Sequence, residues 1–265
     1  MISTGKKQAG FSVVSLLVAS VIGLFLIGGA GKVYVDSKSS FNARSAVSVA
    51  TENTRFAIQD LRRTVVMAGR SIREEDDTPT AYTLPDNGFR TFPAVGTADG
   101  IIDIDGNGSS VIAIRYAGGP APCGQAGTLD GTRAATRTVR FFIDDDDNLV
   151  CQVVETNFEQ PLVPGIIAMR ALYGIDTDGD DIANQYLTAT QVTAANRWLN
   201  VVSIRVGLIT SSGDGGEIPH VYRPAVAEEL DLVGMTFTAP DTTHYFKSAS
   251  TTISLRNLHS SVQKQ

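Results

Sequence analysis

The sequence has few of the residues, and none of the motifs, that build common active sites. Only three histidines occur in 265 residues, His220, His244 and His259, and none belongs to an H-E-x-x-H motif. G-x-S-x-G and P-loop sequences are absent as well. Because the usual metal, nucleophile and phosphate arrangements lack their parts, we predict that the chain is not an enzyme and that each histidine is a surface or strand residue.

An excess of basic residues is also missing. The chain has 22 Lys and Arg against 28 Asp and Glu, a net charge of −6, and without Lys6 and Lys7 the balance falls to −8. A general nucleic-acid binder should show a basic footprint, so no nucleic-acid partner is expected. With 43% hydrophobic and 19% charged residues, the composition is that of a globular protein able to bury a core.

Charge is absent altogether from Gly10 to Ala30, which reads GFSVVSLLVASVIGLFLIGGA. From Phe11 to Ala30 this run has about the 20 residues that a helix needs to cross the hydrocarbon core of a bilayer. The ten residues before it carry Lys6 and Lys7 and no acid. That bias is expected to hold the N-terminus in the cytoplasm, so the rest of the chain should face outward.

Three interpretations compete for this N-terminus. A secretory signal could be cut after Gly28-Gly29-Ala30, although the run is long for one, and a plain membrane anchor would not explain the abrupt junction KKQAGFS at residues 6–12. That junction resembles the leader of a type IV prepilin. The resemblance implies that a prepilin peptidase cuts after Gly10 and leaves Phe11 as the new, methylated N-terminus.

The fifth position counted from Phe11 departs from that family. Prepilins usually carry Glu there, whereas this chain has Ser15. A carboxylate in hydrocarbon is costly and needs a partner, which in pilins is implied to be the N-terminal amine of a neighbouring subunit. Ser15 cannot make that contact, so ordinary packing in the middle of a filament is in doubt, as is methylation of Phe11.

The only two cysteines are Cys123 and Cys151, and they do not form the C-x-x-C motif of a redox centre. Translocation would place them in an oxidising compartment, where a disulfide between them is expected. Closing a loop of this length would contribute about 3.5 kcal/mol on the chain-entropy estimate. The alternative is a pair of buried thiols.

The helical pattern continues beyond Gly31, because residues 33–68 contain no proline and no glycine. We predict one helix from Phe11 to Ala68, with Gly69 as its C-cap. Its second half should dock on a globular domain through five apolar residues at near-helical spacings. These residues are Phe41, Val49, Phe56, Leu61 and Val65.

Strand patterns dominate the rest of the chain. Segments rich in β-branched and aromatic residues lie at 111–116, 138–143, 149–154, 166–173, 198–210 and 244–255, and residues 190–197 suggest a short helix. The second and third segments flank DDDDN at 144–148 and should form a hairpin. We predict an α+β fold, pilin-like, with a long N-terminal α-helix packed on a mainly antiparallel β-sheet head. The expected boundaries are a leader at 1–10, a membrane or filament-core helix at 11–31, its amphipathic half at 32–69 and the head at 70–265.

Five short sequences carry a sharper resemblance. They are ENTRFA at 52–57, VMAG at 66–69, YGIDTDGD at 173–180, WLNVVSIR at 198–205 and LRN at 255–257. In this order they resemble the PilW-like minor pilins, relatives of the J-type pseudopilin of type II secretion. The resemblance implies a low-abundance subunit that helps to start a pilus and sits near its tip.

Two acidic loops resemble cation sites. The candidate Ca²⁺ ligands are Asp103, Asp105 and Asn107 in the first loop and Asp176, Asp178 and Asp180 in the second. Alternating oxygen ligands suit a hard cation, and Gly108 stands where an EF-hand loop turns. The twelfth position, which should be a bidentate Glu, is Ile114 or Leu187. Asp, Asn and Gly are also ordinary turn residues, so neither loop requires an ion.

The sequence therefore predicts a subunit that starts in the inner membrane with its head in the periplasm and ends in the extracellular pilus. Expected partners are the prepilin peptidase, other minor and major pilins, and a pilus tip protein. A type II secretion pseudopilin and an adhesin-like or ligand-binding head displayed on a pilus remain alternatives.

Overall fold

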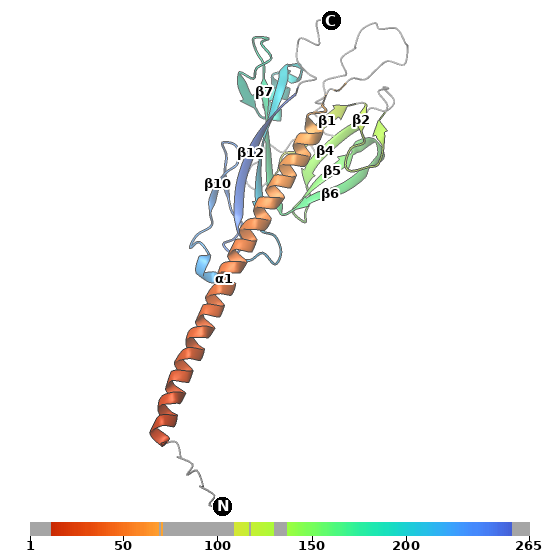
Figure 1. Ribbon diagram of the computed structural model, residues 1–265. Helices are drawn as coiled ribbons and strands as arrows, with labels where there is room; N and C mark the ends of the chain where they lie inside the picture. Colours follow the sequence, from red (N-terminus) through yellow and green to blue (C-terminus); the bar gives the residue numbers. More distant parts are fainter. Residues whose placement is uncertain (1–11, 69, 71–108, 117, 130–136, 256–265) are drawn as a thin grey trace, which may run out of the picture.

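The fold is described from a computed structural model that covers residues 12–68, 70, 109–116, 118–129 and 137–255. A single long helix, α1 (Val13–Val65), carries the head at its C-terminal end (Figure 1). Its 53 residues extend about 80 Å at 1.5 Å per residue. Arg62 and Arg63 lie in the last turn, where cations suit the helix dipole. The predicted end at Ala68 is three residues late, because residues 66–68 form a turn, and Phe11 and Gly69 lie outside the described residues.

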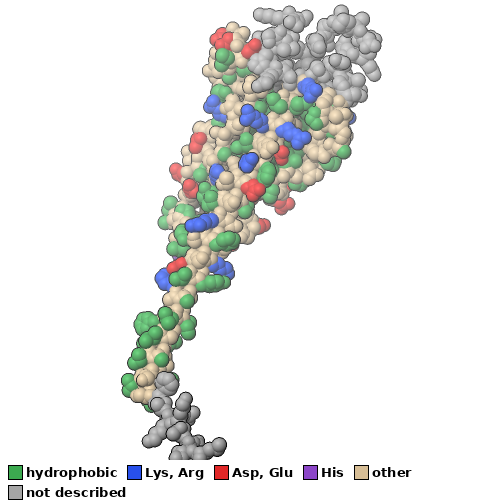
Figure 2. Space-filling model, viewed as in Figure 1, with side chains coloured by type: hydrophobic (Ala, Val, Ile, Leu, Met, Phe, Trp, Pro, Cys, Tyr) green, Lys and Arg blue, Asp and Glu red, His purple; other side chains and the backbone are tan. Residues whose placement is uncertain are grey.

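The first half of α1, residues 13–38, has no buried side chain. Its most apolar 18-residue window has a mean hydropathy of 2.5 and none of it is buried, so the helix is long and apolar enough to cross a membrane. Hydrophobic side chains cover most of this half on the face drawn in Figure 2. The bare half is thus the part of the molecule that needs a membrane or other subunits to cover it.

The second half of α1 docks through a stripe of mostly small residues. The buried positions are Ala46, Ala50, Thr54, Ala57, Leu61 and Val65. They follow one another in steps of three and four, which at about 100° per residue keeps them on one face. The prediction for Leu61 and Val65 is confirmed.

The same prediction is wrong for three of the five apolar residues chosen from the sequence. Phe41, Val49 and Phe56 are 72%, 40% and 49% exposed. At about 100° per residue they point more than about 100° away from Leu61, so no single stripe can hold all five. Small residues take the docking face instead, because they let the helix backbone approach the strands closely.

The head contains two four-stranded antiparallel sheets (Figure 1). The first has the order β1-β4-β5-β6, with β1 at Ile112–Tyr116, β4 at Arg137–Ile143, β5 at Asn148–Val153 and β6 at Phe158–Pro164. The second has the order β12-β9-β7-β8, with β12 at Phe246–Ser254, β9 at Val201–Ser211, β7 at Ile166–Ile175 and β8 at Gln185–Leu187. The predicted α+β arrangement of a long N-terminal helix packed on mainly antiparallel sheets is confirmed.

Short elements complete the head. They are the pairs β2 (Gly119–Pro120) with β3 (Thr128–Leu129) and β10 (Glu229–Asp231) with β11 (Thr236–Thr238), the helix α2 (Ala189–Ala194), and the 3₁₀ turns η2 (Val154–Thr156), η3 (Trp198–Asn200) and η4 (His220–Tyr222). Five of the six predicted strands are confirmed to within two residues, as is the hairpin of β4 and β5. The strand expected from residue 198 begins at Val201, because residues 198–200 form η3. The helix predicted over residues 190–197 is α2, which ends three residues earlier.

The main core fills the space between α1 and the two sheets. Its fully buried large side chains include Leu61 from the helix, Phe141 from the first sheet, and Met169 and Leu208 from the second. A second, smaller cluster lies where the β10–β11 pair meets Ala168, Ile209 and Phe246. The helix is therefore part of the same core as the sheets along its second half only.

Candidate functional site

The bare half of α1 is the first candidate site. Ser15 is exposed there, and the carbonyl four residues before it belongs to Phe11, outside the described residues. Ser20 shows what a hydroxyl does in this run, because its Oγ donates a hydrogen bond of 2.9 Å to the carbonyl of Leu16. The processing pair Gly10 and Phe11 also lies outside the described residues, so cleavage there stays a prediction.

Polar contacts fix the rotation of α1 on the head. The Thr54 hydroxyl lies 2.6 Å from the Ala50 carbonyl and 2.9 Å from the Thr210 hydroxyl of β9, and both threonines are buried. One residue earlier, the Asn53 amide donates to the Pro164 carbonyl of β6 at 3.0 Å. These contacts reach two different sheets from adjacent helix residues, so a rotation of the helix would break both.

A third contact lies on the same stretch of helix. Lys247 Nζ of β12 donates to the Thr51 hydroxyl at 3.1 Å. Sequence reasoning missed these contacts because their partners are more than 100 residues apart. The one available signal was that Thr54 falls on the small-residue face of the helix, where a polar side chain needs a partner.

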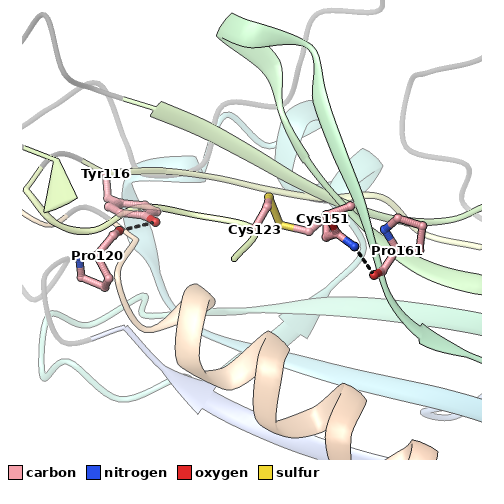
Figure 3. The surroundings of a disulfide bond; sticks show 6 residues. Tyr116, Pro120, Cys123, Cys151 and Pro161 are labelled. Carbon is pink, nitrogen blue, oxygen red and sulfur yellow. Dashed lines mark hydrogen bonds between the residues drawn. A yellow bond between two sulfur atoms is a disulfide. The ribbon is translucent and has the colours of Figure 1, made fainter. Parts of the chain in front are cut away.

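The disulfide between Cys123 and Cys151 is confirmed. It joins the loop between β2 and β3 to the middle of β5, with a Cα–Cα distance of 5.4 Å (Figure 3). Both cysteines are almost fully buried in the main core. Beside it, the Tyr116 hydroxyl at the end of β1 donates to the Pro120 carbonyl at 3.3 Å. The bridge therefore ties the β2–β3 loop to the first sheet.

The second acidic loop begins directly after β7 and is organised by one carboxylate. Asp176 is buried, and its Oδ1 accepts the N–H groups of Asp178 at 3.1 Å and Gly179 at 2.7 Å. Its Oδ2 accepts the N–H of Asp181 at 2.9 Å. The hydrogen bond from Gly179, aided by those from Asp181 and Asp178, lowers the pKa of Asp176 even though burial opposes this. Asp176 therefore works as the acceptor that closes the turn.

The three carboxylates of this loop do lie close together, because ligand oxygens of Asp176, Asp178 and Asp180 fall within 4.8 Å of one another. The last two are exposed and already accept hydrogen bonds, from the Asn184 amide and the Ile182 N–H. Leu187, at the twelfth position, lies in β8 and offers no oxygen side chain. The first loop, with Asp103, Asp105 and Asn107, lies outside the described residues. Binding of Ca²⁺ to either loop stays a prediction.

The role of Asp176 can be tested by pH. Its folded pKa lies below its unfolded value, so its ionised form adds stability above about pH 4, and that stability is lost as the pH falls through the folded pKa. Asp176→Asn should lower the melting temperature at pH 7 and flatten the loss of stability on acidification, because the Asn Nδ2 would face the Asp181 N–H. Asp180→Asn, which removes the same charge and keeps an oxygen for Ile182, should change little. Equal effects of the two variants, measured by thermal unfolding from pH 7 to pH 2, would contradict this role.

The histidines do not come together in the described residues. His220 lies in η4, and His259 is outside the described residues. His244 Nδ1 lies 2.9 Å from Asp241 Oδ2, and Asp241 Oδ1 accepts the N–H groups of Thr243 and His244. Burial opposes ionisation of Asp241, but the hydrogen bonds from His244 and Thr243 outweigh it and lower its pKa to about 2. The pair closes the turn that leads into β12.

The comparisons with known proteins match the head. Residues 140–257, which begin within β4 and include β5 to β12, match the family model of PilW, type IV pilus-assembly protein W. Among solved structures, a type IV-like pilin from Thermus thermophilus is similar over 78% of this chain and 97% of its own, at 11% identity and a TM-score of 0.41. No curated protein matches the chain. The long apolar helix and the antiparallel head thus occur in a chain whose residues 140–257 are similar to the PilW family of type IV pilus-assembly proteins.

Proposed function

We propose that the chain is a minor subunit of a type IV pilus that helps to start assembly and sits at or near the tip. The bare half of α1 carries this proposal, because its fourteen exposed large apolar side chains, between Val13 and Val35, need either a bilayer or the helices of other subunits around them. The matched family is described as a pilus-assembly family, which favours a pilus over type II secretion. Partners on the helix would be other minor and major pilins, and a partner on the head would be a pilus tip protein.

The route to the pilus follows from the same helix. A prepilin peptidase would cut between Gly10 and Phe11 while residues 11–31 hold the chain once in the inner membrane. The head would then lie in the periplasm, where the Cys123–Cys151 disulfide forms, before the subunit enters the extracellular filament. In this proposal, residues 1–10 are the leader, 32–69 the amphipathic half of the helix and 70–265 the head.

The tip position rests on Ser15. In a stack of pilins a buried Glu at this position is tolerated only if it meets a cation, which a neighbour's freed N-terminal amine can supply. A subunit with no neighbour above it has no such amine to meet. A small hydroxyl residue removes the unpaired charge, and the bond from Ser20 to Leu16 in the same run is an example of a hydroxyl satisfied by its own helix.

Replacing Ser15 by Glu should therefore impair assembly. The new carboxylate would be buried without a partner, and this costs free energy. At the centre of a membrane helix a charge costs about 2.5–3.5 kcal/mol on insertion scales, and the cost falls toward the ends of the helix, where Ser15 lies. Ser15→Gln is the matched control, because it adds nearly the same volume without the charge and should assemble like the parent. The count of pili per cell in each strain measures the effect. Unchanged piliation with Ser15→Glu would mean that this position carries no such constraint.

Gold labelling of the head on sheared filaments tests the location. Label confined to filament ends is expected, and label spread along the shafts would contradict a tip position. Deletion of the gene separates the roles: loss of all surface pili supports a role in starting assembly, whereas normal pili with lost attachment would point to an adhesin. Blocked release of exoproteins with normal pili would instead indicate type II secretion.

A further inference from the structure

The loop at residues 219–226, here called the foot loop, gathers exposed apolar side chains. Val221 and Val226 are 73% and 75% exposed, and Tyr222 is 52% exposed. In the described part of the head, residues 109–255, four large apolar side chains are exposed, and three of them are in this loop. The fourth, Ile182, lies in the acidic loop after β7. Exposed apolar surface is therefore concentrated at one place in the head.

That place is the end of the head nearest the bare half of α1. Figure 1 shows η4, the turn at the start of the foot loop, in light blue beside α1 at the point where the helix leaves the head. Val35, Lys38 and Asn42 of the helix line an open groove together with Ile218, Pro219 and Arg223. Arg223 holds the loop in shape, because its Nε donates to the Ile218 carbonyl at 2.8 Å and its Nη2 contacts Glu217 Oε2 at 3.2 Å.

The level of this groove along α1 can be compared with the thickness of a bilayer. The uncharged run from Phe11 to Gly31 is about 31 Å long as a helix, close to the roughly 30 Å of a hydrocarbon core, so the core should end near Gly31. Val35 lies four residues further, or about 6 Å. The headgroup layer on each side is about 5–8 Å thick. The lower edge of the groove, at Val35, therefore lies at the height of the headgroups, and its upper edge, at Asn42, lies about 16 Å beyond Gly31.

The chemistry of the foot loop fits that layer. Tyrosine is enriched where membrane meets water, and Tyr34, 69% exposed, stands on α1 at nearly the same height. Charge near this level is mixed, since Lys32 Nζ pairs with Asp36 Oδ2 at 3.1 Å and Arg223 with Glu217. Lys38 also lines the groove. The contact is therefore expected to depend mainly on covering Val221, Tyr222 and Val226.

We propose that, while the subunit is anchored by α1, the foot loop rests in the headgroup layer of the same bilayer through Val221, Tyr222 and Val226. This contact would fix the tilt and rotation of the head above the membrane and would be released when the subunit is pulled into a filament. The inference rests on the membrane anchoring proposed above.

Single cysteines carrying the fluorophore NBD provide the test. Cysteine is placed at Val221, Val226, Ile182 or Leu24 in the full chain, since the native cysteines are bonded to each other and do not react. Each protein is reconstituted at low density into phosphatidylcholine vesicles that contain a lipid with a nitroxide on its headgroup or on its acyl chain. We expect loss of emission with the headgroup nitroxide at Val221 and Val226, loss with the acyl-chain nitroxide at Leu24, and no loss at Ile182.

The four positions separate the possible failures. Quenching at Leu24 without quenching at Val221 or Val226 would contradict the proposed contact between the foot loop and the membrane, but would agree with membrane anchoring by α1. No quenching at Leu24 would contradict both the membrane anchoring by α1 and the contact between the foot loop and the membrane. Equal quenching at Ile182 would mean that the head lies on the membrane without a preferred side, which also overturns the proposal. In the protein labelled at Val221, Val226→Asp should reduce the quenching, because a charge opposes insertion of the loop.

Discussion

Replacing Cys123 and Cys151 together by alanine should lower the free energy of unfolding by about 3.5 kcal/mol. The two residues are 28 apart in sequence, and releasing a loop of that size restores about this much chain entropy to the unfolded state. Alanine is preferred to serine, because both positions are almost fully buried and a hydroxyl there would add a desolvation cost. Urea unfolding of the full chain in detergent, with and without reductant, measures the difference.

The reductant supplies the control. The parent should lose stability on reduction, whereas the double alanine variant should not respond. If reduction shifted both proteins equally, the bridge would not be the cause of the difference. If neither reduction nor the double substitution lowered the urea midpoint, the disulfide would contribute nothing to the stability of the head.

Leu61→Ala should be about as damaging, with a loss of about 2–5 kcal/mol in the free energy of unfolding. Leu61 is fully buried between α1 and the sheets, so its removal leaves a cavity in the main core. Phe56→Ala is the matched control from the same helix. Its side chain is larger but 49% exposed on the other face, and its loss should change the free energy of unfolding by no more than about 0.5 kcal/mol.

These two variants test which face of α1 packs against the head. Thermal unfolding of both proteins in the same detergent gives the comparison. A large loss for Phe56→Ala with a small one for Leu61→Ala would mean that the helix docks through its large apolar residues, and the orientation described here would be wrong.

Local chemistry made much of the fold predictable. The helix was predicted because residues 33–68 have neither proline nor glycine, and the strands because β-branched and aromatic residues cluster in short runs. The hairpin of β4 and β5 is a clear case. The N–H of Asn148 donates to Asp144 Oδ1 at 2.7 Å, so the turn residues that marked the hairpin in the sequence also hold it closed.

The docking face of the helix could not be predicted in the same way. Choosing large apolar residues gave Phe41, Val49 and Phe56, whereas the head selected Ala46, Ala50 and Ala57. Which face a helix buries depends on how closely its backbone must approach the strands, and that distance is set by residues far away in sequence.

The candidate site residues also differ in whether local sequence was enough to predict them. The disulfide could be predicted because the chain has only two cysteines and is expected to reach an oxidising compartment. The acidic loop could be predicted from its Asp and Gly turn residues. The bond between Thr54 and Thr210, by contrast, joins residues 156 apart and depends on the finished packing of α1 against β9.

N-terminal sequencing of the protein isolated from membranes and from sheared filaments tests most directly whether this chain matures as a pilin subunit. Both forms should begin at Phe11, because cleavage after Gly10 leaves the whole apolar half of α1 on the mature subunit. A Gly10→Val variant should remain uncut and stay out of filaments. A mature protein that begins at Gly31 would contradict maturation as a pilin, since it would lack the apolar half of α1 that is proposed to pack in the filament.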